Sequence, residues 1–241
     1  MSGGRPGTKS SQSSSGSGGG SGGGAAAEAS SGRGASRVRD IQAALDEAAA
    51  ESRRSGAPLE YLDVGCSEGR ITAAVAGHLG LRPGSAFGVD VVDQPADPAF
   101  TFRRTDGVTL AFPDATFGLE TMMMSAHHFR EPAKVFAEAR RVARPGATLV
   151  MREHDTAPAY LALFFDLAHA VYAVMVNAEE TPQQFAEAYA AGQYAFYRSR
   201  DQWAELIAPT GWKLVRYIQP SLGPKKTTDF MQAYYAVFRA A

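Results

Sequence analysis

The sequence predicts an α/β fold: a seven-stranded, mostly parallel sheet with helices on both faces and a helical lid insert. Three observations support this prediction. Short apolar segments alternate with segments of helical periodicity along the chain. Two strand–helix units in succession imply parallel strands joined by right-handed crossovers. The last two predicted strands are close enough in sequence to form an antiparallel pair.

The first 35 residues differ from the rest of the chain. They are mainly Gly, Ser and Ala and contain no Leu, Ile, Val or aromatic side chain. Such a segment cannot contribute to a hydrophobic core. We therefore expect a disordered tail over residues 1–35 and one domain over residues 36–241, which is long enough to bury a sizeable core.

The domain is predicted to open with a helix and a strand. Ser36 can cap the helix, apolar residues recur at helical spacing between Val38 and Ala49, and Gly56-Ala57-Pro58 ends it. Residues 59–64 follow as an apolar segment that ends just before a glycine. This segment is therefore the first expected strand.

The central part of the chain continues the alternation. Residues 71–79 place apolar side chains on one helical face, and Gly80 closes the helix. Short apolar segments then predict strands over residues 87–90, 100–103 and 119–124. In order, the remaining elements are an amphipathic helix over 131–143 stopped by Pro145-Gly146, a strand over 148–151, an aromatic helical insert over about 157–200, a capped helix over 199–208, and strands over 211–218 and 233–238.

Composition limits the classes of function. A formal net charge of −1 provides no basic surface for nucleic acid, so a nucleic-acid partner is not expected. The single cysteine, Cys66, excludes an internal disulfide and a cysteine-rich zinc site. There is no signal-peptide pattern and no apolar segment of about 18 residues. We expect a cytoplasmic protein without membrane insertion.

Polar and glycine residues follow five of the predicted strands. In a mostly parallel sheet, ligands bind beyond the carboxyl ends of the strands. Five separate segments would therefore meet at one edge of the sheet. These segments are Gly65 to Gly69, Asp90, Asp106, Ser125 to His128, and Glu153 to Asp155.

Two common nucleotide motifs are absent. A dinucleotide fingerprint requires G-x-G-x-x-G, and the residues after Gly65 lack its second and third glycines. Gly223-Pro224-Lys225-Lys226-Thr227 matches only the end of a phosphate loop and lies between two predicted strands, so it is interpreted as a solvated turn. NAD and nucleoside triphosphates are therefore disfavoured as ligands.

The motifs along residues 59–155 resemble those of class I S-adenosylmethionine-dependent methyltransferases. The similarity is greatest to the small-molecule group that includes ubiquinone-biosynthesis enzymes, methyltransferase type 11. Asp63-Val64-Gly65-Cys66-Ser67-Glu68-Gly69 is similar to an acid, a hydrophobe and Gly-x-Gly-x-Gly, with Ser67 at the middle glycine. A serine fits there if its φ is negative. Arg140 to Gly146 is similar to the family's helix stop Arg-Val-Leu-Lys-Pro-Gly-Gly.

The resemblance implies a Rossmann-like domain that binds S-adenosylmethionine. Asp90 would accept hydrogen bonds from the ribose hydroxyls, because a carboxylate has two adjacent acceptor oxygens, with Asp93 as the alternative acid. Asp106 would accept from the adenine amino group, and Val91 and Gly107 would flank the ring. The remaining expected cofactor contacts are Asp63, Gly65, Cys66, Ser67 and Gly69 at the methionine end, and Ser125 after the fourth strand.

The acceptor is expected to be a small molecule, because the aromatic insert resembles a substrate lid. Methyl transfer requires alignment and exclusion of water, and some acceptors also need a base. The candidate catalytic residues are His128, His127 and His154. No metal is expected at Glu153-His154-Asp155, because adjacent side chains on a strand point to opposite faces.

Three alternative functions stay open from the sequence. A catalytically silent subunit could retain the fold and the cofactor, and Ser67 in place of glycine supports that alternative. The acceptor could be a macromolecule. The third alternative is an enzyme that uses NAD or a nucleotide sugar, and tight binding of NAD would support it.

Overall fold

A seven-stranded sheet forms the centre of the molecule. The computed structural model describes residues 22–93, 99–171, 174, 181–190, 195–221 and 232–241. The strand order is β3-β2-β1-β4-β5-β7-β6. The first five strands are parallel, and β7 runs antiparallel to both β5 and β6. The predicted α/β class, with its mostly parallel sheet and its late antiparallel pair, is confirmed.

The strand bounds are close to the expected ones, with one exception. The strands are β1 (Tyr61–Val64), β2 (Ala86–Asp90), β3 (Thr101–Arg104), β4 (Phe117–Met123), β5 (Ala143–His154), β6 (Trp212–Ile218) and β7 (Ala233–Ala240). β5 begins directly after the preceding helix and includes Pro145-Gly146, whereas the prediction started it at Thr148. The register of β4 against β5 shifts between Phe117 and Leu119, which accommodates this early start.

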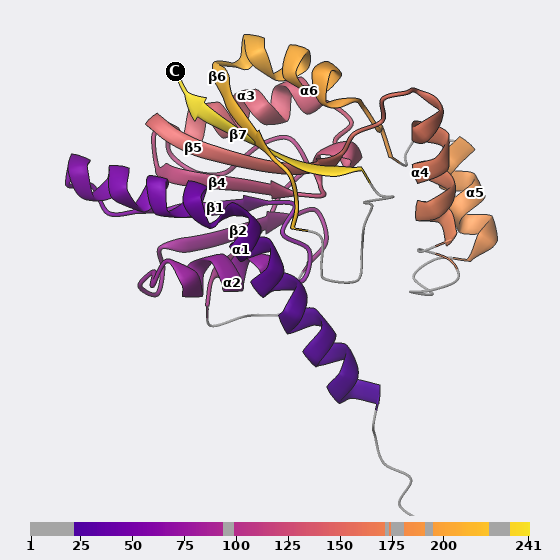
Figure 1. The fold of residues 1–241 in the computed structure, drawn as a ribbon, viewed down its shortest axis with the longest axis horizontal. Coiled ribbons are helices and arrows are strands. Elements are labelled where there is room, and N and C mark those ends of the chain that lie inside the picture. The colour runs from indigo at the N-terminus through magenta and orange to yellow at the C-terminus, as the bar shows by residue number, and fades with distance from the viewer. Residues whose placement is uncertain (1–21, 94–98, 172–173, 175–180, 191–194, 222–231) are drawn as a thin grey trace, which may run out of the picture.

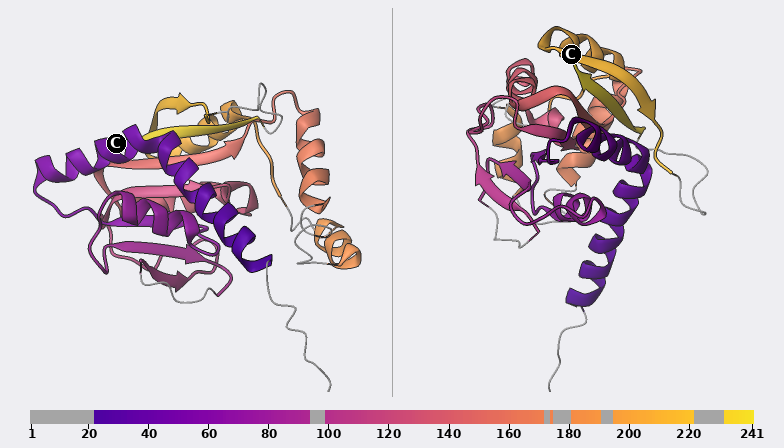
Figure 2. Two further views of the ribbon diagram at one scale, coloured as in Figure 1. Left: turned by 60° about the horizontal axis from the view of Figure 1, so that its bottom comes forward. Right: turned by 90° about the vertical axis from the view of Figure 1, so that its left-hand side faces the viewer.

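Helices cover both faces of the sheet (Figures 1 and 2). On one face, α1 (Gly22–Ser55) packs with α2 (Arg70–His78), and their core residues include Ile41, Leu45 and Val75. On the other face, α3 (Pro132–Val142) and α6 (Arg200–Ile207) enclose Phe136 and Trp203. The two apolar clusters lie on opposite sides of the sheet and together form the core.

The start of α1 differs from the sequence prediction. The helix begins at Gly22, not at Ser36, so the expected boundary of the tail at residue 35 is wrong for residues 22–35. Gly34 is buried, and a Cβ added there would lie 3.1 Å from the Ala74 Cβ and 3.2 Å from the Arg70 carbonyl oxygen. The missing side chain lets α1 continue against α2. Residues 1–21 of the predicted tail lie outside the described residues.

The insert stands beyond the carboxyl ends of the parallel strands. It contains α4 (Tyr160–Val171) and α5 (Pro182–Ala190), and Figure 1 shows both helices at the same end of the sheet. The chain then returns through residues 195–199 to α6. Residues 172–173, 175–180 and 191–194 of the insert, and the turn at 223–227, are outside the described residues.

Candidate active site

A cavity of about 870 Å³ opens at the carboxyl ends of β1, β2 and β4. This volume is within the range of pockets that bind small molecules, roughly 300–1,000 Å³. Eight residues expected from the sequence line it: Gly65, Ser67, Asp90, Val91, Asp106, Gly107, Ser125 and His128. Five expected residues do not line it: Asp63, Cys66, Gly69, His127 and His154.

Gly65 allows a close approach between β1 and the loop after β4. Its φ is 75°, and a Cβ at this position would lie 2.4 Å from the Ser125 Cβ. The Ser125 hydroxyl donates to the Val64 carbonyl at 2.8 Å and fixes the contact. A larger residue at position 65 would therefore separate the two strand ends, or fill the space beside them.

Two residues other than glycine in the cavity wall have left-handed backbone conformations. Ser67 has φ 48° and Met124 has φ 63°. The condition for an unstrained serine at position 67, a negative φ, is therefore not met. Its backbone N–H donates to Asp90 Oδ2 at 2.8 Å, and this bond holds the turn in place. Strained backbone of this kind concentrates at ligand sites, because the surrounding structure must maintain it.

Asp90 lies at the end of β2 with both carboxylate oxygens oriented by backbone groups. Oδ2 accepts from Ser67 N at 2.8 Å, and Oδ1 accepts from Val92 N at 3.2 Å. A carboxylate offers about four lone-pair positions, so two bonds leave capacity for a ligand. The alternative acid, Asp93, is exposed and bonds to Arg104 at 3.2 Å.

Asp106 forms a turn at the edge of the cavity. Its Oδ1 accepts from the backbone N–H groups of Thr109 at 2.6 Å and Val108 at 2.8 Å. These bonds lower the pKa of the Asp106 carboxyl. Val91 Cγ1 lies only 3.2 Å from the position of a Cβ on Gly107. An aromatic ring cannot fit between these two residues, so the expected flanking arrangement requires the exposed Val91 side chain to rotate.

Asp63 is enclosed behind the cavity. Oδ2 accepts from the Thr72 hydroxyl at 2.6 Å, and Oδ1 accepts from the Thr121 hydroxyl at 2.7 Å. Burial raises the pKa of Asp63 to about 6, and the two threonine bonds oppose that shift. Asp63 therefore links α2, β1 and β4, and it does not line the cavity.

Cys66 and Gly69 also support the turn from behind. The Cys66 thiol is buried, and burial raises its pKa, which makes it a poor nucleophile. Gly69 precedes α2 with φ 73°, and a Cβ there would lie 2.0 Å from the Phe100 ring. Only glycine permits this contact between the turn and the ring.

A buried histidine–glutamate pair lies next to the cavity. Glu153 at the end of β5 accepts two hydrogen bonds from His127, one from Nδ1 at 2.7 Å and one from the backbone N–H at 3.2 Å. Burial alone would raise the pKa of Glu153, but the His127 imidazole and backbone N–H together with His154 outweigh it, and the pKa is lowered. His127 is thereby fixed in the short 3₁₀ helix η1 (Ala126–His128).

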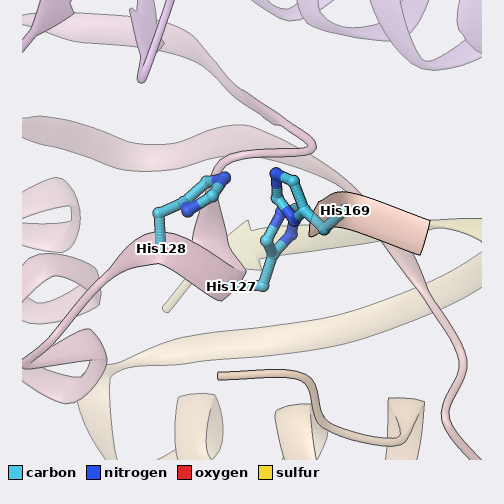
Figure 3. Close-up of side chains that lie close together, drawn as sticks. All are labelled: His127, His128 and His169. Carbon is cyan, nitrogen blue, oxygen red and sulfur yellow. The ribbon is translucent and has the colours of Figure 1, made fainter. Parts of the chain in front are cut away.

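Two further imidazoles lie against His127. The ring centroid of His128 is 4.3 Å from that of His127, and the ring of His169 on α4 is 5.0 Å from that of His128 (Figure 3). Desolvation and the neighbouring imidazoles lower the pKa of His128, although one side of this residue is exposed at the cavity. Burial and His127 lower the pKa of His169 to about 4. Both rings are therefore neutral near pH 7.

His154 and Asp155 have structural partners instead of a common ligand. The His154 ring stacks on Phe165 of α4 with centroids 4.3 Å apart. Asp155 Oδ1 accepts from the Arg200 backbone N–H at 3.2 Å, at the start of α6. The side chains of Glu153, His154 and Asp155 thus go to three different places, and His154, a candidate catalytic residue, does not line the cavity.

Several residues of the site could not be identified from the sequence. His169 comes from the insert, and its Nδ1 lies 2.9 Å from the Tyr197 hydroxyl. Both residues belonged to an aromatic segment whose pattern predicted packing. No sequence motif marks Thr72 or Thr121 as partners of Asp63, because only folding brings their hydroxyl groups to its carboxylate.

Comparison with known families agrees with the site. Residues 62–151 match the family described as a methyltransferase domain. They include most of β1 and all of β2 and β4, whose carboxyl ends line the cavity, and most of β5. Residues 62–151 therefore carry the sequence features of a methyltransferase domain.

Two curated relatives have similar sequences over part of the chain. A demethylmenaquinone methyltransferase of Renibacterium salmoninarum is 29% identical over 123 residues, which cover 50% of this chain and 51% of the relative. A 27-O-demethylrifamycin SV methyltransferase of Amycolatopsis mediterranei is 29% identical over 107 residues, covering 40% of this chain and 39% of the relative. The chain thus spans about half or less of the length of these relatives.

A solved structure shows the same fold. It is a methyltransferase from Methanosarcina mazei, with a TM-score of 0.53 and 16% identity, covering 76% of this chain and 92% of that protein. At this identity the likeness concerns the fold alone. Among the helices in the part of the chain described by the structure, none is long and apolar enough to cross a membrane.

Proposed function

We propose that this chain binds S-adenosylmethionine in the 870 Å³ cavity and transfers its methyl group to a small-molecule acceptor. The observation that supports this most directly is the position of Asp90. It lies at the carboxyl end of β2, in the cavity wall, with its carboxylate oriented by two backbone N–H groups. When bound, S-adenosylmethionine supplies an electrophilic methyl group on a sulfonium.

The cavity has the features that this ligand requires. Gly65 lets the end of β1 and the loop after β4 approach closely, and it lies in the cavity wall where the methionine portion would bind. Asp90 would accept from the ribose hydroxyls and Asp106 from the adenine amino group. Asp63, Cys66 and Gly69 would act indirectly, because they hold the turn that carries Gly65 and Ser67.

His128 is the histidine that would contact the acceptor. It lines the cavity next to Ser125, whereas His127 and His154 do not. A neutral imidazole can accept a hydrogen bond from an acceptor hydroxyl and orient it for displacement. His127 would act as a positioning residue, because its bonds to Glu153 fix the η1 segment that carries His128.

A small-molecule acceptor is supported by the curated relatives, whose names refer to demethylmenaquinone and demethylrifamycin SV. The insert over α4 and α5 stands over the carboxyl edge of the sheet, where it could enclose such an acceptor (Figure 1). Closure of this kind excludes water from the reacting groups.

Calorimetry with S-adenosylmethionine and S-adenosylhomocysteine tests the proposal. The wild-type chain should bind both, and Asp90→Ala should weaken binding by roughly a hundredfold or more, because the lost carboxylate makes charge-assisted hydrogen bonds. Asp93→Ala is the matched control, since Asp93 is an exposed acid three positions away that does not line the cavity. Absence of binding to either compound would contradict the proposal.

Methyl transfer is measured separately. Labelled S-adenosylmethionine is incubated with the protein and with either the low-molecular-weight or the macromolecular fraction of a cell extract. Label should enter the low-molecular-weight fraction, and His128→Ala should reduce the transfer while cofactor binding persists. Binding without transfer to either fraction would favour a silent subunit, and label in macromolecules alone would identify a different acceptor class.

A further inference from the structure

We propose that His127, His128 and His169 form a binding site for a zinc ion between the sheet edge and the insert. Each residue offers one ring nitrogen as a ligand atom, and the three nitrogen atoms lie within 4.8 Å of one another. Figure 3 shows the three rings gathered together, two from η1 and one from α4. Apart from His128 at the cavity, this cluster is separate from the residues expected to bind the cofactor.

The cluster needs only a small adjustment to coordinate an ion. Tetrahedral zinc with bonds of about 2.0–2.1 Å places its ligand nitrogens roughly 3.3 Å apart, so the nitrogens would approach by up to about 1.5 Å. His128 is exposed at the cavity and can rotate. His127 is fixed by Glu153, so the other two rings would close around it.

Two neighbouring groups hold the rings as the hydrogen-bond partners of metal-bound histidines do in zinc sites. His127 Nδ1 bonds to the buried Glu153 carboxylate at 2.7 Å, so Nε2 is the nitrogen that would coordinate the ion. His169 Nδ1 lies 2.9 Å from the Tyr197 hydroxyl. A metal-bound imidazole usually donates its other N–H to a carboxylate or another polar group, which fixes the tautomer and the ring orientation.

The ligand set selects the kind of ion. Three imidazoles without a carboxylate ligand suit zinc and other late transition metals, whereas magnesium and calcium prefer oxygen atoms. Three histidines also leave a fourth position open, as in catalytic zinc sites. Since His128 lines the cavity, we expect this open position to face it.

The ion would have two effects on the molecule. It would join α4 to η1 at the sheet edge and so hold this helix against the end of the sheet. Its open position would take an oxygen or nitrogen atom of the acceptor, a consequence that rests on the proposed function. While His128 coordinates the ion, its imidazole cannot also accept a hydrogen bond from the acceptor, so the ion would orient the acceptor atom in place of the ring. The site itself does not depend on methyl transfer and can be measured without S-adenosylmethionine.

Zinc binding is measured by competition with a chromophoric chelator, using chelator-treated full-length protein. The wild-type chain should bind one zinc ion, and His128→Ala and His169→Ala should each weaken binding at least about tenfold. Glu153→Gln should weaken it about 10-fold to 100-fold, because the Glu153 carboxylate holds the His127 ring. His78→Ala is the matched control, because His78 lies on α2 beside Asp46 and outside the cluster. Magnesium should not compete.

A second readout reports the coordination geometry. Cobalt substituted for zinc should give the visible absorption of a four-coordinate ion, and His169→Gln, which retains a side chain of similar size, should abolish it. Unchanged zinc affinity in both His128→Ala and His169→Ala, or binding equally weakened by His78→Ala, would overturn the site. S-adenosylmethionine binding to the metal-free protein is measured in parallel, so failure of the metal site and failure of the proposed function give different results.

Discussion

The Asp63 carboxyl is buried between two threonine hydroxyl groups, and this position has a consequence for stability. Its pKa is raised to about 6 in the folded chain, from 3.8 for an exposed aspartate. An acid with a raised pKa binds its proton more tightly in the native state. Between about pH 4 and pH 6 the native state therefore holds more protons, and the free energy of unfolding falls as the pH rises.

Asp63→Asn should remove this pH dependence. The shift of about 2 pKa units corresponds to about 3 kcal/mol. The free energy of unfolding of the variant, measured relative to wild type, should therefore rise by up to about that much from pH 4 to pH 7. Urea denaturation at several pH values measures the difference. Thr72→Val should act in the opposite direction and steepen the pH dependence, because it removes a hydrogen bond that lowers the pKa of Asp63. Parallel curves for Asp63→Asn and wild type would contradict this argument.

The left-handed backbone conformation of Ser67 also lowers the stability of the folded chain. For a residue that has a Cβ, a left-handed backbone conformation is unfavourable by about 1–2 kcal/mol. Glycine adopts this conformation readily but loses more conformational entropy on folding. Ser67→Gly should therefore stabilise the chain by roughly 0.5–1 kcal/mol and keep the bond from the backbone of residue 67 to Asp90.

Ser67→Ala provides the comparison, because alanine retains the Cβ and should bring no gain. The measurement is the midpoint of urea unfolding with an unchanged slope. If both variants stabilise equally, the hydroxyl and not the backbone conformation is responsible for the strain. If neither does, the positive φ carries no measurable cost at this site.

The residues of the cavity could be predicted to a large extent, and the misses share one cause. Asp90, Asp106, Gly65 and Ser125 follow strands, so their location at the carboxyl edge comes directly from the alternation of strands and helices. Asp63 also follows from this pattern, but the pattern does not show that two threonines from other elements enclose it.

At the scale of elements, the capped start of α6 is a clear case of local sequence determining structure. The Ser199 side chain accepts from the Gln202 backbone N–H, and the Gln202 side chain accepts from the Ser199 backbone N–H. This reciprocal pair, a capping box, satisfies two of the N–H groups at the start of the helix. The sequence predicted this helix, with its cap, at nearly the observed bounds.

Ser199→Ala should lower the free energy of unfolding by about 1 kcal/mol, because one helical N–H loses its partner. Ser199→Asp should restore most of that stability, since aspartate is an equally good capping residue. Both are measured by urea denaturation. A loss with Asp as large as with Ala would mean that the hydroxyl has a role other than capping.

Other element boundaries depended on contacts that the sequence pattern does not reveal. Residues 22–35 have the composition of a linker, yet the structure continues α1 through them, and Gly34 packs against α2. Pro145-Gly146 correctly predicted that the preceding helix ends nearby. It also predicted that the next strand begins only after this dipeptide, which is wrong. In the structure, Phe117 pairs with Ala143, and β5 therefore starts at once.

At the scale of the whole molecule, the histidine cluster joins segments that are remote in the sequence. His127 and His128 follow β4, Glu153 ends β5, and His169 belongs to the insert. The sequence indicated each segment separately, but the contact between the insert and the sheet edge is a tertiary property. Periodicity cannot predict it, because the aromatic residues of the insert have the same pattern whether they pack on one another or on η1.

Ligand binding at the carboxyl edge should stabilise the whole chain. A ligand that binds only the native state adds about 2.7 kcal/mol at a concentration of 100 times its Kd, which raises Tm by roughly 5–10 °C for a domain of this size. S-adenosylmethionine should produce this shift in the wild-type protein and lose it in Asp90→Ala, because Asp90 is the oriented acid of the cavity wall.

NAD is the decisive comparison ligand for this thermal shift. The turn after β1 lacks the second and third glycines of the dinucleotide fingerprint, and Ser67 occupies part of that turn with its Cβ. NAD at the same concentration should therefore leave Tm unchanged. A shift with NAD that matches or exceeds the shift with S-adenosylmethionine would assign the cavity to a dinucleotide, and the proposed methyl transfer would have to be abandoned.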